Sequence, residues 1–193
     1  MKKKMPVEDL TVEDLEQEIS RVKYQRRYRS VLKSTIYTLV YVAAIAVLVA
    51  TLWLPVLQIY GSSMTPTLQD GEVVFSVRTD QMNPGDIVAF YYNNKILVKR
   101  VIAGPGDWVD ILEDGTVMVN DVILDEPYLM EKSYGDADIT LPYQVPDGRI
   151  FVMGDQRETS VDSRHEAVGC VSQEQIVGKI IFRIWPLDRL GGF

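Results

Sequence analysis

The sequence predicts a mainly β domain behind one N-terminal membrane-spanning helix, and three observations lead to this prediction. The first is an apolar run at residues 35–56 that contains no charged residue. The second is the pattern after residue 70, where short β-branched and aromatic runs alternate with turn sequences rich in Gly, Pro and Asn. The third is charge, because residues 1–34 carry a net +3 and the remaining residues a net −10. The chain therefore divides into a basic leader, an apolar segment and an acidic body.

The apolar run, TIYTLVYVAAIAVLVATLWLPV, is long enough to be a membrane anchor. At about 1.5 Å per helical residue it covers the roughly 30 Å hydrocarbon core of a bilayer. A cleavable signal peptide would have a shorter leader and a shorter apolar part. A buried core helix is less well matched, because this run is apolar on every face and Tyr37, Trp53 and Tyr60 lie near its ends, where interfacial aromatic residues occur. We predict an uncleaved transmembrane helix at 35–57.

The leader at 1–34 sets the predicted orientation. Residues 21–33 hold six basic residues and no acidic one, and positive charge stays on the cytoplasmic side of a membrane. We therefore expect residues 58–193 to form an extracytoplasmic domain. Apolar residues recur near helical spacing in the leader, and TVED at 11–14 resembles a capping box, which predicts a short cytoplasmic helix at or near the membrane. The apolar residues are Val7, Leu10, Leu15, Ile19 and Val22. A solvated charged leader and a partner-binding helix both fit this pattern.

The acidic body predicts an antiparallel, mostly β domain with one hydrophobic core. Six runs have the composition of strands, and the segment 172–176 is expected to form one helical turn. The strand runs are residues 72–79, 86–92, 95–103, 116–120, 149–153 and 178–185. Between them lie NPGD, NN, GPGD, EDG and PDG, in which Gly and Asn tolerate positive φ and Pro presets φ.

Several classes of function are disfavoured by composition. An acidic body lacks the basic face that nucleic-acid binding requires. The single cysteine, Cys170, cannot form an internal disulfide, and we expect it to be a small buried filler. No Cys/His cluster has the spacing of a metal site, so we expect no metal and no cofactor.

Nucleophilic catalysis needs a base beside the nucleophile, and the sequence offers two candidate bases. A Ser-His-Asp triad would need His165, the only histidine, which falls in a polar segment and is more simply an exposed loop residue. The other candidate is Lys99, which in a strand lies between branched apolar neighbours. Burial there would lower the pKa of the amine and let it deprotonate a serine, whereas an exposed strand edge would leave it an ordinary surface lysine.

In the segment 153–169, which follows a hydrophobic run, the ten positions 155–164 hold five charged residues. These residues are Asp155, Arg157, Glu158, Asp162 and Arg164. A solvated turn with internal ion pairs and a functional loop both account for them.

Four boxes in this order behind one anchor resemble bacterial type I signal peptidase, the membrane-anchored serine/lysine endopeptidase that removes signal peptides from exported proteins. The boxes are GSSMTPTL (61–68), GDIVAF (85–90), VKRVIAGPGDWV (98–109) and GDQRETSVDSR (154–164). The resemblance covers residues 35–186 and implies a barrel-like antiparallel catalytic domain. The short gap between Asp107 and Gly154 resembles the compact members typical of Gram-positive bacteria.

The resemblance also implies residue roles. Ser63 would be the nucleophile and Lys99 the general base. Supporting roles would fall to four residues: a hydroxyl that orients the lysine (Ser160), a salt bridge (Asp162 and Arg164) and a structural acid (Asp155). Three apolar residues match positions that line the pockets for small residues at −1 and −3 of the cleavage site, namely Met64, Leu68 and Val98.

The oxyanion donor departs from part of the family. Some members have a serine two residues before the nucleophile, where this chain has Gly61. The backbone amide of Ser63 would then serve, with Ser62 as a weaker candidate.

The resemblance implies a cell-membrane protein with a cytoplasmic N-terminus. Its partners would be signal peptides of exported preproteins, membrane lipid and the export translocon, and no nucleic acid. A peptidase dedicated to pilin or conjugation substrates, or a non-catalytic membrane-tethered module that binds peptides, stands as the alternative.

Overall fold

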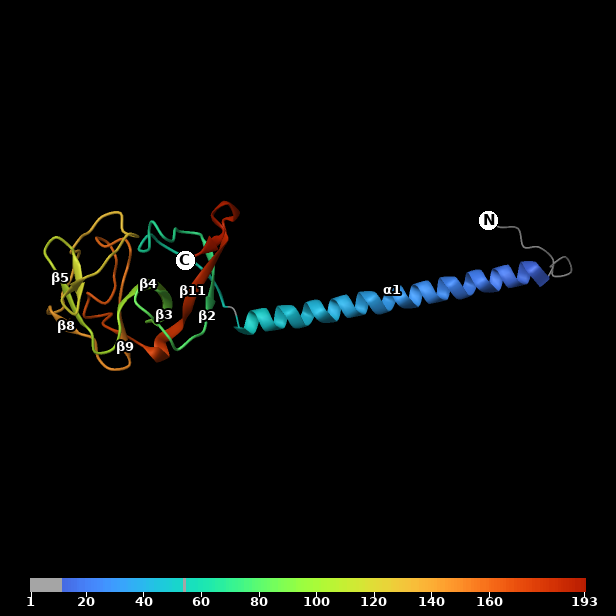
Figure 1. Cartoon of the computed structure of the whole chain (residues 1–193), viewed down its shortest axis with the longest axis horizontal. Coiled ribbons are helices and arrows are strands. Elements are labelled where there is room, and N and C mark those ends of the chain that lie inside the picture. Colours follow the sequence, from blue (N-terminus) through green and yellow to red (C-terminus); the bar gives the residue numbers. More distant parts are fainter. Residues whose placement is uncertain (1–11, 54) are drawn as a thin grey trace. The chain divides into compact units, whose positions relative to one another are not determined.

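The computed structural model describes residues 12–53 and 55–193, and divides into two compact units at Val49 and Ala50. The N-terminal unit contains all but the last four residues of one long helix, α1 (Val12–Trp53) (Figure 1). Within Leu15–Leu48 this helix contains a stretch that is long and apolar enough to cross a membrane. The leader and the anchor therefore share one continuous helix, where a separate short helix was expected, because neither Gly nor Pro interrupts residues 12–53.

The predicted anchor at 35–57 is too long at its C-terminal end. Helix α1 ends at Trp53, and Pro55 follows two residues later. Strand β1 (Val56–Gln58) then begins inside the predicted span. Proline disfavours helical backbone at the residue before it, which accounts for the early end. The leader residues Val7 and Leu10, and the first residue of the expected capping box, lie outside the described residues.

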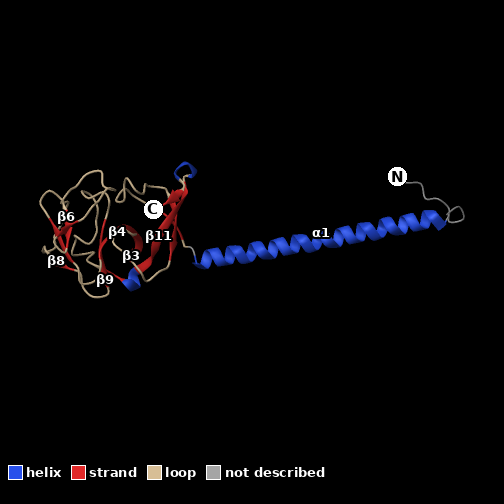
Figure 2. Cartoon of the chain, in the orientation of Figure 1, coloured by secondary structure: helices blue, strands red, loops and turns tan. Residues whose placement is uncertain are grey.

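The C-terminal unit is built of antiparallel strands in two sheets (Figure 2). Among the described residues the larger sheet has the strand order β1-β2-β11-β3-β4-β9-β10, with β12 pairing β11. Its further strands are β2 (Val73–Val77), β3 (Ile87–Tyr92), β4 (Lys95–Ala103), β9 (Arg149–Met153), β10 (Val171–Ser172), β11 (Ile176–Trp185) and β12 (Gly191–Gly192). The mainly β, antiparallel prediction is confirmed, although the ladder order is open and does not close into a barrel.

The smaller sheet has the order β7-β6-β5-β8 and lies at the opposite end of this unit from β2 and β11 (Figure 1). Its strands are β5 (Trp108–Ile111), β6 (Val117–Val119), β7 (Val122–Ile123) and β8 (Tyr143–Gln144). Two short 3₁₀ turns, η2 (Gln173–Gln175) and η3 (Leu187–Arg189), flank β11. The expected helical turn at 172–176 corresponds to η2.

Strand β3 runs through the core of the larger sheet, and its alternating residues are buried on both faces. Ile87 and Ala89 belong to one apolar cluster with Met64, whereas Val88 and Phe90 belong to another. A third cluster joins the ends of β4 and β9 to the smaller sheet and includes Cys170. Cys170 is buried, as expected, and burial raises the pKa of its thiol to about 11.

Candidate active site

Ser63 lies in a tight turn that follows β1. The turn begins at Gly61, whose φ of +87° is a conformation that residues with a side chain rarely adopt. The Gly61 amide donates to Asp70 Oδ1 at 2.7 Å, and the amide of Thr65 donates to the Ser62 carbonyl at 3.0 Å. These bonds fix the backbone on both sides of Ser63, whose side chain is half-buried.

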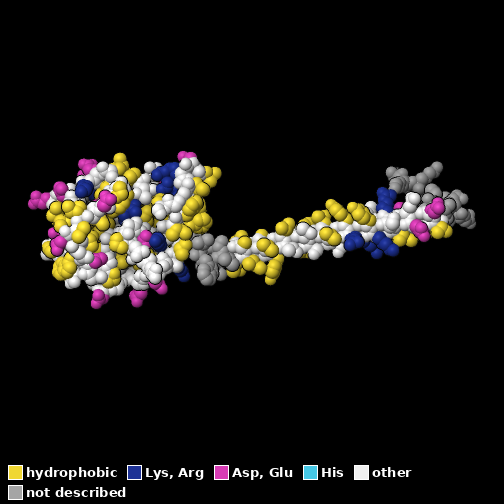
Figure 3. Space-filling model, in the orientation of Figure 1, with side chains coloured by type: hydrophobic (Ala, Val, Ile, Leu, Met, Phe, Trp, Pro, Cys, Tyr) yellow, Lys and Arg dark blue, Asp and Glu magenta, His cyan; other side chains and the backbone are white. Residues whose placement is uncertain are grey.

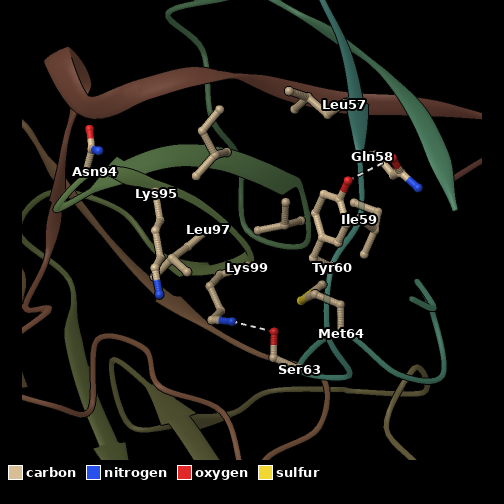
Figure 4. Close-up of a pocket in the computed structure, with 13 residues that line it drawn as sticks. Leu57, Gln58, Ile59, Tyr60, Ser63, Met64, Asn94, Lys95, Leu97 and Lys99 are labelled. Carbon is tan, nitrogen blue, oxygen red and sulfur yellow. Dashed lines mark hydrogen bonds between the residues drawn. The ribbon is translucent and has the colours of Figure 1, made fainter. Parts of the chain in front are cut away.

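Lys99 reaches the same place from strand β4. Its Nζ lies 2.6 Å from Ser63 Oγ, and the two form a hydrogen bond (Figure 4). Lys99 is only 2% exposed, so the surface-edge interpretation of this lysine is wrong. Strand β4 pairs with β3 along its whole first half, with Lys99 opposite Val88, and its pairing with β9 begins at the next residue, Arg100.

Burial changes the acid–base character of Lys99. Removal of the amine from water lowers its pKa from 10.5 to about 8, because a buried ammonium loses its hydration. Asp162 and Asp155 oppose this shift, while Arg164 reinforces it. About one tenth of the lysine is therefore neutral at pH 7, and a neutral amine can accept a proton from a serine hydroxyl.

Gly154 allows the Ser63 turn to pack against the loop after β9. A Cβ atom at Gly154 would lie 2.5 Å from the Ser63 carbonyl oxygen and would overlap Ser160 Oγ, so no larger residue fits. The Ser63 carbonyl also accepts a hydrogen bond from the Gln156 amide at 3.1 Å. The backbone of the candidate nucleophile is thus held directly by this loop.

The loop itself is organised by a buried ion pair between Asp162 and Arg164. Arg164 Nε donates to Asp162 Oδ1 at 2.9 Å and Nη2 donates to Oδ2 at 3.0 Å, with both side chains 0% exposed. Burial alone would raise the pKa of Asp162, but Arg164 and the Gly154 amide lower it below its usual value. The Asp162 carboxylate is therefore a fixed negative charge near Lys99.

A second buried ion pair ties three segments of the site together. Arg100, next to Lys99, donates from Nε and Nη2 to the Asp155 carboxylate at 2.8 and 2.6 Å. Asp155 Oδ2 also accepts from Thr67 Oγ1 at 2.5 Å, four residues after Ser63. The Arg100 guanidinium stacks on the Tyr128 ring at 3.9 Å. Strand β4, the Ser63 turn and the loop after β9 therefore meet at one carboxylate.

The solvated-turn interpretation is wrong for four of the five charged residues at 155–164. Asp155, Arg157, Asp162 and Arg164 are all buried, and only Glu158 is exposed. Arg157 pairs with Glu126, which no pattern in the sequence singles out.

Two polar residues of this loop make fewer contacts with the site. The Ser160 hydroxyl is buried and helps lower the pKa of Asp162, but it makes no hydrogen bond of normal geometry within the described residues, to Lys99 or to any other group. His165 is half-buried rather than exposed, and its Nδ1 accepts the Asp162 amide at 3.4 Å. No hydrogen bond in the part of the chain that the structure describes joins His165 to Ser63.

An open cleft of about 470 Å³ leads to Ser63 and Lys99. One wall is formed by residues 57–61, in and after β1, and the other by residues 94–98 of the β3–β4 turn and β4 (Figure 4). Strand β1 ends the larger sheet, and residues 95–99 of β4 pair only with β3 among the described strands. Both walls therefore present unpaired strand edges, which can bind an extended peptide by backbone hydrogen bonds.

The three predicted pocket residues belong to one apolar cluster but do not all reach the cleft. Met64 and Val98 line it, whereas Leu68 is 0% exposed and packs behind Met64 among the core residues. The sequence missed Leu57, Ile59 and Tyr60 as lining residues. The position of residues 56–58 directly after the apolar helix could have indicated that they lie near the site. Three residues are too few, however, to be recognised as a strand.

A cluster around Glu72 supports the turn from its other side and was also missed. Arg183 Nε lies 2.8 Å from Glu72 Oε2, and Arg189 Nη1 donates to Glu72 Oε1 at 2.5 Å. The same arginines donate to the carbonyl oxygens of Thr67 and Pro66. Charged residues of β11 and η3 therefore hold the turn that carries Ser63.

Two groups can donate to an oxyanion beside Ser63. The Ser63 backbone amide has no hydrogen-bond acceptor among the described residues, and Ser62 is exposed next to it. No group of three or more His, Cys, Asp or Glu residues that could hold a metal occurs in residues 12–53 and 55–193.

Comparisons with known proteins show which sequences this chain resembles. The family described as signal peptidase, peptidase S26, matches residues 32–185. Signal peptidase IB of Staphylococcus aureus is 41% identical over 152 residues, which cover 68% of this chain and 78% of that protein. The chloroplastic thylakoidal processing peptidase 1 of Arabidopsis thaliana is 33% identical over 146 residues, covering 67% of this chain and 41% of that protein.

A crystal structure of a signal peptidase I from Enterococcus faecalis is 32% identical and superposes with a TM-score of 0.44, covering 51% of this chain and 96% of that one. The extent of the family match and the identity to the staphylococcal enzyme lead to one conclusion: the chain belongs to the signal peptidase family, peptidase S26.

Proposed function

We propose that Ser63 and Lys99 carry out the reaction by which this membrane-anchored signal peptidase I removes signal peptides from exported preproteins. One observation carries the proposal, which is the 2.6 Å contact between Lys99 Nζ and Ser63 Oγ in the cleft. A pKa of about 8 suits Lys99 to act as a base at physiological pH.

The reaction begins with attack of Ser63 Oγ on the carbonyl carbon of the scissile peptide bond. The hydroxyl proton passes to the neutral amine of Lys99 as the new carbon–oxygen bond forms. The carbonyl oxygen becomes an oxyanion, which the Ser63 amide is placed to stabilise, with Ser62 as a second donor. Lys99 then returns the proton to the leaving amine, the carbon–nitrogen bond breaks, and the signal peptide remains as an ester on Ser63.

A water molecule completes the cycle. Lys99 accepts a proton from the water as its oxygen attacks the ester, and the Ser63 oxygen leaves with a proton returned by Lys99. Asp162, Arg164 and Asp155 act as positioning residues, because they hold the segments that carry the two reacting groups. We assign Ser160 the orientation of the lysine amine, because its hydroxyl is buried and has no hydrogen-bond partner among the described residues.

The substrate would lie extended between the unpaired edges of β1 and β4. Backbone hydrogen bonds to these edges bind any sequence, so selection depends on the apolar surface of the cleft. Met64 and Val98 would face the side chains at −1 and −3, with Leu68 fixing Met64 from behind. A shallow apolar surface accepts small side chains and excludes bulky ones.

The orientation is also part of the proposal. Six basic residues at 21–33 favour a cytoplasmic leader, which would place the β domain outside. Signal peptides would then reach Ser63 as they leave the export translocon in the same lipid bilayer. A protease added to spheroplasts should digest the β domain and spare the leader, whereas digestion of the leader alone would reverse this assignment.

The experiment that tests the function is cleavage of a preprotein with an Ala-x-Ala site by the purified full chain in detergent or lipid vesicles. Product masses and the new N-terminus identify the cleaved bond. We expect cleavage after the second alanine. If the folded protein cuts neither this preprotein nor a panel of related sites, a dedicated peptidase or a peptide-binding module becomes the better explanation.

A further inference from the structure

The N-terminal part of α1 carries an apolar stripe that the peptidase reaction does not use. Val12, Leu15, Ile19 and Val22 are spaced by three, four and three residues, which is the a-d-a-d pattern of two heptads. All four are exposed, by 74, 48, 51 and 40%. A regular stripe of this kind on a charged helix buries its surface against another helix.

The stripe lies well outside the apolar part of α1. Figure 3 shows charged side chains gathered on the N-terminal half of the helix, and no charged residue follows Lys33 in it. Val22 precedes Ser34 by twelve residues, or about 18 Å along a helix axis. The headgroup layer extends only about 7 Å beyond the hydrocarbon core. Because α1 is continuous, it carries the stripe away from the lipid surface.

We propose that this stripe is the interface with a second copy of the same chain, in a parallel two-stranded coiled coil. Two copies anchored in one membrane with one topology must present their leaders side by side and in the same direction. The a positions hold Val12 and Ile19, which are β-branched, and the two d positions hold Leu15 and Val22, of which only Leu15 is leucine. β-Branched residues at a with leucine at d favour the parallel dimer over higher oligomers.

The surface of the helix already has the shape that a partner side chain needs. A shallow hollow is lined by Leu15, Glu18, Ile19, Val22, Lys23 and Arg26. In a parallel coiled coil the side chain at a enters a hole made by the preceding d and g residues and by the a and d residues of its own layer. These are Leu15, Glu18, Ile19 and Val22, so the hollow fits Ile19 of the second copy.

The charges beside the stripe are complementary in the same register. Glu18 occupies a g position and Lys23 the e position five residues later, which are the positions that meet across a parallel dimer. Each interface would contain this pair twice. Glu18 has one competing partner within its own helix, Arg21, but that ion pair spans 3.8 Å between side chains that are 68 and 54% exposed and is therefore weak.

The interface is short, and the membrane compensates for this. Arg26 and Arg29 occupy the next a and d positions, so the apolar seam ends after two heptads. Two heptads in water are too short for a stable isolated coiled coil. Anchoring both copies in one bilayer raises their effective concentration and makes a weak interface sufficient.

The test is disulfide crosslinking of the purified full chain in phosphatidylcholine vesicles, where no other protein is present. Cys170→Ser removes the only native cysteine, and Ile19→Cys then places one cysteine in the seam. Gln17→Cys is the matched control, since it occupies the f position on the opposite face. We expect mild oxidation to give a dimer at least about fivefold faster at position 19 than at position 17.

A charge exchange tests the register independently. Glu18→Lys and Lys23→Glu, each alone in the Ile19→Cys protein, should slow crosslinking about fivefold by placing like charges across the interface, and the double exchange should restore it. Equal crosslinking at positions 17 and 19 would overturn the proposal. So would burial of position 19 in lipid without a dimer, or crosslinking in cell membranes to a protein of different mass and not in vesicles.

Discussion

Replacement of Lys99 by methionine should stabilise the protein while it abolishes activity. Burial lowers the pKa of Lys99 from 10.5 to about 8, so below pH 8 the folded protein holds an ammonium that would be better hydrated in the unfolded chain. The difference between these two pKa values corresponds to about 3 kcal/mol. Loss of the hydrogen bond to Ser63 offsets about 1 kcal/mol of this gain. We expect Lys99→Met to raise the free energy of unfolding by about 2 kcal/mol at pH 7.

The stability difference between Lys99→Met and wild type should depend on pH. Between pH 8 and 10.5 the unfolded wild type binds more protons than the folded one, so its stability increases with pH in that window. Lys99→Met lacks this dependence, and its advantage should therefore shrink as the pH rises from 8 to 10.5. Denaturant unfolding of the detergent-solubilised chain at pH 7 and at pH 10 measures both values. Lys95→Met, at an exposed lysine of the same strand, is the matched control and should be nearly neutral at either pH.

One result would contradict this reasoning: Lys99→Met is less stable than wild type at pH 7, and the loss of stability is the same at pH 10. It would mean that Lys99 is charged in the folded state without a desolvation penalty. The proposed role of burial in preparing a neutral base would then be wrong.

Two further predictions concern the rate. The value of kcat/KM should rise about tenfold from pH 7 to pH 9, because the neutral fraction of Lys99 rises from about one tenth to about nine tenths. A pH profile that is flat above pH 7 would mean that another group is the base. Gly154→Ala should lower kcat by about a hundredfold, because the added methyl group displaces the Ser63 backbone. Gly191→Ala is the control, since its methyl group enters open space and should leave kcat unchanged. A wild-type kcat in Gly154→Ala would show that this packing does not position Ser63.

The strands that could be predicted from sequence are those with long apolar runs. Residues 95–103 and 149–153 match β4 and β9 at both ends, because these strands are central and their composition is decided by burial. The run at 178–185 was placed two residues short of the start of β11. Strands β1, β7, β8, β10 and β12 have two or three residues each, too few for a pattern, and depend on their neighbours for pairing.

Ser63 and Lys99 were proposed as the reacting pair from the ordered boxes, whereas the contact between them depends on tertiary structure. Residue spacing could not decide whether Lys99 was buried, since an exposed edge strand has the same pattern. Its burial comes from the Ser63 turn and the loop after β9, which are distant in sequence. The Glu72 cluster was missed for the same reason. Its two arginines lie in β11 and η3, more than a hundred residues after Glu72 in the sequence.

The most direct measurement of the central claim is preprotein cleavage by Ser63→Ala and by Lys99→Ala, with His165→Ala as the control. Circular dichroism and thermal unfolding should first establish that each variant is folded. We predict that either substitution in the Ser/Lys pair lowers kcat/KM by at least about a thousandfold, whereas His165→Ala stays near the wild-type rate. Near-normal cleavage by folded Lys99→Ala, or a collapse of the rate in His165→Ala, would contradict the assignment of Lys99 as the base.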